Sequence, residues 1–167
     1  KMEALIEDNR LTGGTVVIAR KGKVAHFETY GLRNLEEELP VEKDTIFRIY
    51  SMTKAITSMA ALMLWEEERL ELDDPLSKFF PSLKKMKVWK DGNLIDTKRE
   101  ATIADLLRHT SGLTYGWMSS KPIREALRSA GVLDRNKKLV PMISGMADVP
   151  LQFQPGSDWV YGCSTDV

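Results

Sequence analysis

A long apolar run behind a short β-type segment constrains this chain more than any other feature. Residues 45–50 are rich in β-branched and aromatic side chains, which is typical of a strand. Residues 55–65 are then apolar at most positions, and Glu66 opens a charged segment. A helix that is apolar on nearly all sides is normally buried. We therefore expect a strand over 45–50 that leads into a buried central helix ending near residue 65.

Ser51 stands where the expected strand turns into the expected helix, and Lys54 follows three residues later. Residues at this spacing share one helical face, about one turn apart. An ammonium directed into a buried region costs several kcal/mol unless it is paired or deprotonated. A lysine in this position can therefore act as a base for the serine hydroxyl. The alternative interpretation is that Ser51 is simply the N-cap of the helix.

The pattern Ser-x-x-Lys is short, so by itself it does not establish catalysis. A second copy occupies residues 82–85, after Pro81 in a basic segment. We expect that copy to lie on the solvated surface. The assignment of Ser51 as a nucleophile therefore depends on the residues around it.

Residues 47–58 read Phe-Arg-Ile-Tyr-Ser-Met-Thr-Lys-Ala-Ile-Thr-Ser. This segment resembles the serine β-lactamase and penicillin-binding-protein superfamily. It is most similar to the branch that holds class C β-lactamases and the β-lactamase-like carboxylesterases of esterase family VIII. Three further stretches match in order, at residues 70–76, 102–113 and 155–164. The resemblance covers nearly the whole chain from about Gly13 onward and corresponds to the N-terminal part of the family's domain.

The order of the expected elements indicates an α+β fold, because strands come first and helices later. We expect a helix within 1–10, a hairpin of strands 15–19 and 24–31, a small hairpin within 88–97, and helices at 103–108, 122–131 and 139–149. The resemblance implies a β-lactamase/transpeptidase-like fold, with an antiparallel sheet, packed helices and a mostly helical lobe, incomplete in this chain. The hairpin and nucleophile helix would occupy about 1–75 and the helical lobe about 76–167 of a single domain.

The resemblance implies that Ser51 attacks an acyl carbonyl while Lys54 and Tyr161 share the proton. Tyr161 matches the tyrosine that opens the family's Tyr-x-Asn or Tyr-x-Ser motif. A tyrosine alone has a pKa near 10 and is a poor base at neutral pH. A nearby ammonium favours the phenolate, so the pair can hold one proton and pass it on. The alternative is that Tyr161 is an ordinary half-buried packing residue.

Cys163 departs from the family pattern, which has Asn or Ser at this position. A thiol is a weak hydrogen-bond donor and acceptor, so the departure favours esters over β-lactams as substrates. A nucleophilic role for Cys163 is disfavoured, because free cysteines are mostly buried and inert. We expect Tyr50, Trp159 and Cys163 to contact the substrate. The aromatic side chains of residues 115, 117 and 159 either line an acyl pocket or belong to the core.

Other catalytic designs fit the sequence less well. There is no Gly-x-Ser-x-Gly elbow and no glycine-rich phosphate loop. His26 and His109 are the two histidines, and a Ser-His-Asp triad around His109 has no further support. We expect His109 to cap or orient the backbone after a helix. Two distant histidines and one cysteine make a zinc site unfavourable, so no metal or other cofactor is expected.

Composition limits the partners. The 24 basic and 24 acidic residues cancel, which argues against nucleic acid. No apolar run approaches the roughly 20 residues of a membrane span. The single cysteine excludes an internal disulfide. The N-terminus shows no signal peptide, which favours the cytoplasm, although the chain begins at Lys1 rather than Met.

The leading hypothesis is a serine hydrolase that cleaves small carboxylic esters through a Ser51 acyl-enzyme. The alternatives are a β-lactamase or D-amino-acid peptidase of the same fold, or a non-catalytic binding member. The resembled family continues with further strands and a third motif, Lys-Thr-Gly or His-x-Gly, and neither pattern occurs here. We therefore expect further sequence, or a second chain, to supply that C-terminal remainder.

Overall fold

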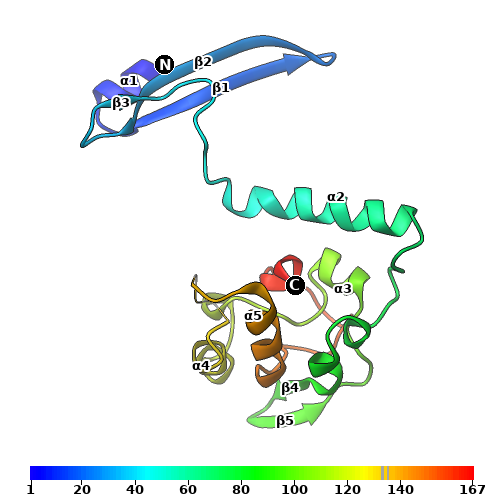
Figure 1. The fold of residues 1–167 in the computed structure, drawn as a ribbon. Coiled ribbons are helices and arrows are strands. Elements are labelled where there is room, and N and C mark those ends of the chain that lie inside the picture. The colour runs from blue at the N-terminus through cyan, green and yellow to red at the C-terminus, as the bar shows by residue number, and fades with distance from the viewer. Residues whose placement is uncertain (133, 135) are drawn as a thin grey trace. The chain divides into compact units, whose positions relative to one another are not determined.

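The structure, a computed structural model, describes residues 1–132, 134 and 136–167, which divide into two units, Lys1–Ile49 and Tyr50–Val167. The first unit contains helix α1 (Met2–Glu7) and strands β1 (Gly13–Arg20), β2 (Lys23–Asn34) and β3 (Leu39–Pro40) (Figure 1). The strands form an antiparallel sheet in the order β1-β2-β3. The prediction of an N-terminal hairpin is confirmed.

Two local features fix this hairpin. Lys21 and Gly22, at the turn, have φ values of 51° and 73°, which is the backbone of the two-residue turns that match the twist of paired strands. Gly31 has a φ of 63°, and a Cβ there would lie 2.2 Å from the carbonyl oxygen of Thr12. Position 31 therefore requires glycine.

Helix α2 (Thr53–Glu66) forms where the apolar run predicts a helix, but the prediction that it is buried is wrong. None of its residues is buried, and Ile56 and Met59 are 63% and 60% exposed. A helix is buried only where another element packs against it. Within the described residues, the element distant in sequence that contacts α2 is chiefly the 3₁₀ turn over Cys163–Asp166.

The prediction of a strand over 45–50 is also wrong. Residues 45–49 have no regular structure, and Tyr50–Met52 form a 3₁₀ turn. A strand is stabilised by a hydrogen-bonded neighbour, and none pairs with residues 45–49 in the part of the chain that the structure describes.

The core of the second unit lies among its remaining elements. These are β4 (Lys87–Lys90), β5 (Asn93–Asp96), α3 (Ile103–Arg108), α4 (Lys121–Ser129), α5 (Leu139–Gly145), and 3₁₀ turns over Leu76–Lys78, Pro81–Lys85, Gly116–Met118 and Met146–Asp148. Ile123, Leu127, Ile143 and Leu151 are almost completely buried in this core. The β4–β5 hairpin and all three helices occur where the sequence predicts them, and the α+β class is confirmed.

Ser82 and Lys85, the ends of the second Ser-x-x-Lys copy, are exposed as expected. Among the residues with described positions, no helix is both long and apolar enough to cross a membrane. The same residues contain no group of three or more His, Cys, Asp or Glu side chains placed to hold a metal ion.

Candidate active site

Ser51 lies in the 3₁₀ turn directly before α2, with its side chain exposed. The residue that caps α2 is Met52, so Ser51 does not serve as the N-cap. Tyr50, just before it, has a φ of 47° and is 70% exposed. A left-handed backbone is unfavourable for a bulky side chain, and such outliers cluster at functional sites. The local geometry therefore presents Ser51 at a strained and accessible turn.

Lys54, one turn after Ser51, closes a three-membered polar ring with Tyr115 and Asp166. The Lys54 ammonium donates to the Tyr115 hydroxyl at 2.9 Å and to Asp166 Oδ1 at 3.2 Å. The Tyr115 hydroxyl in turn donates to Asp166 Oδ2 at 2.8 Å. The Lys54 side chain is only 15% exposed. Its polar partners in the described part of the structure are therefore a phenol and a carboxylate, not Ser51.

The charges in this ring follow from its contacts. Burial opposes the charge on Lys54, but its hydrogen bonds to Tyr115 and Asp166 and the nearby carboxylate raise its pKa overall. Burial raises the pKa of Tyr115 to about 12, and the bond to Asp166 adds to that effect against the opposing influence of Lys54. In this arrangement Lys54 is an ammonium and Tyr115 a neutral phenol. Lys54 must lose a proton before it can accept one from Ser51.

Tyr161 lies beside this ring. Lys54 Nζ is 5.5 Å from the centroid of the Tyr161 ring and 5.4 Å from that of Tyr115. Both distances are within the range of cation–π attraction. The structure thus brings Lys54 and Tyr161 together as predicted from the resemblance. The proton-sharing role of Tyr161 stays a prediction.

Five aromatic rings form a continuous row, which we call the aromatic row, and two of them lie beside the ammonium. It runs Trp117, Tyr115, Tyr161, His109 and Trp159, with successive centroids 4.6, 5.9, 4.9 and 6.3 Å apart. The two tryptophans at its ends are 70% and 58% exposed. An aromatic row with exposed ends, beside the ammonium of Lys54, is suited to bind an apolar part of a substrate.

The three residues predicted to contact the substrate lie in different surroundings. Tyr50 and Trp159 are exposed, and Trp159 ends the aromatic row. Cys163 is buried in the core, and its thiol donates to the Thr114 carbonyl at 3.5 Å. Substrate contact by Cys163 stays a prediction, and its buried position does not support it.

His109 orients the backbone, in keeping with the prediction. It ends α3 in the left-handed conformation, with a φ of 58°. Its Nδ1 accepts a hydrogen bond from the Gly162 N–H at 3.4 Å. Burial and the charge of Lys54 lower the pKa of His109, against a smaller opposing effect of Asp166. The ring is therefore neutral at neutral pH, as an accepting nitrogen requires.

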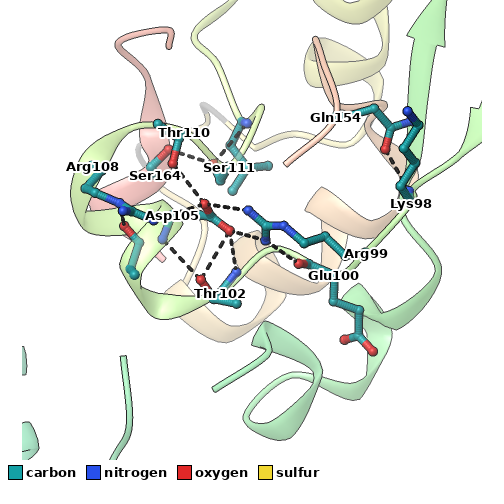
Figure 2. A network of polar contacts seen from close by, with 12 residues as sticks. Lys98, Arg99, Glu100, Thr102, Asp105, Arg108, Thr110, Ser111, Gln154 and Ser164 are labelled. Atoms are coloured by element: carbon teal, nitrogen blue, oxygen red, sulfur yellow. Dashed lines mark hydrogen bonds and ion pairs between the residues drawn. The ribbon is translucent and has the colours of Figure 1, made fainter. Parts of the chain in front are cut away.

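A buried carboxylate fixes the start of α3. Asp105 accepts two bonds from Arg99, at 2.5 and 3.0 Å, and others from Thr102 and the Thr110 hydroxyl (Figure 2). Thr102 caps the helix reciprocally, as predicted. Because Asp105 also holds Thr110, the network sets the course of the chain from His109 toward Tyr115.

Two further contacts join that loop to the segment that carries Tyr161 and Asp166. The hydroxyls of Ser111 and Ser164 lie 2.9 Å apart in the core. Gly162 packs so closely that a Cβ there would lie 2.5 Å from Thr114 Cα. The polar ring is thus assembled from segments more than 50 residues apart, as the 53-residue separation of the two serines illustrates.

Sequence reasoning missed Asp166 and considered Tyr115 only as a lining or core residue. The one signal in the sequence was that Asp166 is an acidic residue shortly after the tyrosine motif, and that Lys54 needed a partner for its charge. Spacing alone could not assign that partner, because residues 161 and 166 share no regular element.

Comparison with known proteins identifies the family. The family model described as Beta-lactamase matches residues 1–166, and the chain therefore belongs to the Beta-lactamase family. The resemblance seen in the sequence is confirmed.

Three similar proteins illustrate the range of that family. Protein Rv1367c of Mycobacterium tuberculosis is 36% identical over 162 residues, which cover 94% of this chain and 40% of the relative. Esterase EstB of Burkholderia gladioli is 33% identical, with 97% of this chain and 40% of the relative covered. The solved structure of EstCE1, titled "a hydrolase with promiscuous acyltransferase activity", matches with a TM-score of 0.81 and 28% identity over 98% of this chain and 42% of its own. The chain thus spans about 40% of the length of these curated relatives.

Proposed function

We propose that the natural protein carrying this chain is a serine hydrolase that cleaves carboxylic esters through an acyl-enzyme on Ser51. The observation that carries the proposal is the accessible Ser51 one turn before Lys54, whose ammonium lies over the ring of Tyr161. The similarity to an esterase over 97% of this chain supports an ester as substrate.

The proposed reaction proceeds through a covalent acyl-enzyme on Ser51 and transfers the Ser51 proton to the leaving group. Ser51 Oγ attacks the ester carbonyl, and its proton passes to the Lys54–Tyr161 pair. The pair then protonates the oxygen of the leaving alcohol as its bond to the acyl carbon breaks, and the acyl group stays on Ser51. Water attacks this acyl-enzyme, and the same pair takes the proton from water and returns one to Ser51. The backbone N–H of Ser51 would supply one donor to the oxyanion, where loss of a donor typically costs about 10²–10³ in rate.

Acyl transfer is a second candidate. It is favoured by the likeness to EstCE1, whose title gives acyltransferase activity alongside hydrolysis. The two reactions share the acyl-enzyme and differ only in whether water or an alcohol attacks it. The exposed aromatic row offers an apolar surface on which an alcohol acceptor can bind in place of water.

Ser51→Ala in the natural protein tests the nucleophile. We expect p-nitrophenyl butyrate turnover to fall to background while the thermal melt is unchanged, because the Ser51 side chain is exposed. Ser82→Ala, in the exposed second copy of the motif, is the matched control and should keep full activity. A fluorophosphonate probe should add one mass adduct to the wild type and none to Ser51→Ala. Retained turnover in a folded Ser51→Ala variant would exclude this function.

A further inference from the structure

The polar ring of Lys54, Tyr115 and Asp166 contains two residues that the proposed reaction does not use. Asp166 contributes both carboxylate oxygens, one to the ammonium at 3.2 Å and one to the phenol at 2.8 Å. The Tyr115 hydroxyl accepts a hydrogen bond from the Lys54 ammonium at 2.9 Å, so each of the three groups contacts the other two. An isolated exposed ion pair contributes little to stability, whereas here the Lys54 side chain is only 15% exposed and its ammonium has two partners that also bond to each other.

We propose that Tyr115 and Asp166 are positioning residues for ester hydrolysis, which fix the direction of the Lys54 ammonium, one turn after Ser51, and set the pH range in which Ser51 is activated. This inference rests on the proposed function. Neither residue exchanges a proton with the substrate. Both act through Lys54.

Positioning is needed because a lysine side chain has a flexible four-carbon stem and a large rotamer entropy. Two acceptors, on the Tyr115 hydroxyl and on Asp166, fix the direction of the ammonium at the end of that stem. Tyr115 is itself held by a stacked contact with Trp117, at 4.6 Å between centroids and 17° between planes. The polar ring therefore has an aromatic contact that supports Tyr115.

The charge of Asp166 acts in a single direction on Lys54. A carboxylate 3.2 Å from Lys54 Nζ stabilises the ammonium form of the lysine. The unprotonated lysine that can accept the Ser51 proton therefore appears only at higher pH. Removing the carboxylate should move the rising limb of the pH–rate profile to lower pH.

Other titratable groups near Lys54 do not reverse this sign. Those in contact with the ring or influenced by its charges are Tyr115, Tyr161, His109 and Cys163. Tyr115 is a neutral phenol, and burial favours the neutral forms of His109 and Cys163. Asp166 is therefore the anion within the described set that holds the charge of Lys54 in place.

The test compares pH profiles of kcat/KM for p-nitrophenyl butyrate in the natural protein and its variants, after subtraction of the Ser51→Ala background. Asp166→Asn keeps the shape and removes the charge. We expect its rising limb to move down by about 1 pH unit or more, as loss of an opposite charge at this range implies. Asp166→Glu keeps the charge and should leave the limb near its wild-type position. Glu125→Gln, which removes an exposed carboxylate on α4, is the charge-matched control and should not move it.

Tyr115→Phe separates positioning from charge. It removes the hydroxyl between the ammonium and the carboxylate but leaves Asp166 in place. We expect kcat to fall by about tenfold or more, the scale of a lost charge-assisted hydrogen bond, with a smaller movement of the limb than in Asp166→Asn. The rate of fluorophosphonate labelling of Ser51 against pH gives a second readout that needs no turnover.

The outcomes distinguish this inference from the proposed function. An unmoved limb in a folded Asp166→Asn variant, with Ser51→Ala inactive, overturns the inference and leaves the esterase standing. Turnover in Ser51→Ala overturns the esterase itself. Asp166 is 39% exposed, so neutral variants should fold. If Asp166→Asn and Asp166→Ser both fail to fold, Asp166 is a folding element and the inference is wrong.

Discussion

Ser111 and Ser164 share a hydrogen bond of 2.9 Å, although 53 positions separate them and neither side chain is exposed. Ser111 follows the left-handed end of α3, and Ser164 lies two residues before Asp166. Ser111 Oγ also accepts a bond from the Leu113 N–H at 3.1 Å. The pair therefore joins the loop that carries Tyr115 to the turn that carries Asp166.

The two serines should differ in how much stability is lost when each is replaced by alanine. Ser111→Ala leaves both the Ser164 hydroxyl and the Leu113 N–H unpaired, whereas Ser164→Ala leaves Ser111 still bonded to Leu113. Each buried group left unsatisfied costs about 1–3 kcal/mol. We expect Ser111→Ala to lower the free energy of unfolding more than Ser164→Ala, measured by urea denaturation. Equal losses would indicate that the bond to Leu113 is not formed.

Two arginines near Asp105 should differ sharply in their effect on stability. Arg99 makes two close bonds to the buried carboxylate, while Arg108 approaches it only to 3.7 Å from an exposed position. Arg99→Ala should cost about 1.5–3 kcal/mol, the range for hydrogen bonds to a charged group. Arg108→Ala should cost less than about 1 kcal/mol, as exposed pairs do. Chemical denaturation of both variants measures the difference, and similar losses would contradict it.

Asp105 should also make the fold sensitive to acid. Burial opposes its charge, but the bonds from Arg99, Thr102 and Thr110 hold the pKa of this carboxyl below its ordinary value in the fold. Its stabilising contribution is therefore complete above the unfolded pKa, about 3.9, and is lost as pH falls from there through the folded pKa. Asp105→Asn should be less stable than wild type at pH 7 and should lose less additional stability between pH 5 and 3. A steeper loss in the variant would contradict this assignment.

Cys163 should be chemically inert in the folded protein. Burial raises the pKa of its thiol to about 12, so almost no reactive thiolate exists at pH 8. The aromatic disulfide reagent DTNB should leave the native protein unmodified and react fully in denaturing urea. Rapid modification under native conditions would show that the thiol is accessible and would revive a role for it at the substrate.

Esters should be preferred over cephalosporins. The family's polar residue at position 163 is replaced here by a thiol that already donates to Thr114 and is almost completely buried. We expect a higher kcat/KM for p-nitrophenyl butyrate than for nitrocefin. A clear advantage for nitrocefin would favour the β-lactamase alternative.

The parts of the fold that the sequence predicts are those specified by local chemistry. Gly22 and Gly92, at the tips of the two hairpins, both have positive φ, and each lies between strands of suitable composition. Thr102 and Asp105 form a capping box that defines the start of α3 without reference to the rest of the chain. Boundaries of this kind depend on neighbours within a few residues.

What the sequence could not predict depends on distant partners. The apolar run at 55–65 predicts a helix correctly, but its burial depends on what packs against it. The site shows the same limit. Ser51 and Lys54 are linked by helical spacing, while Asp166 reaches Lys54 from 112 positions away. No local pattern encodes that separation.

The close approach of Gly162 to Thr114 sets a rule for engineering the site. A Cβ at position 162 would lie 2.5 Å from a backbone atom, which cannot move aside as the end of a flexible side chain can. Randomised libraries across residues 159–163 should therefore return only glycine at 162, whatever activity is selected. Position 159, where Trp159 is exposed, has in contrast space for other side chains. Substitution of residue 162 is therefore not available, in evolution or in the laboratory, as a way to change the surroundings of Tyr161.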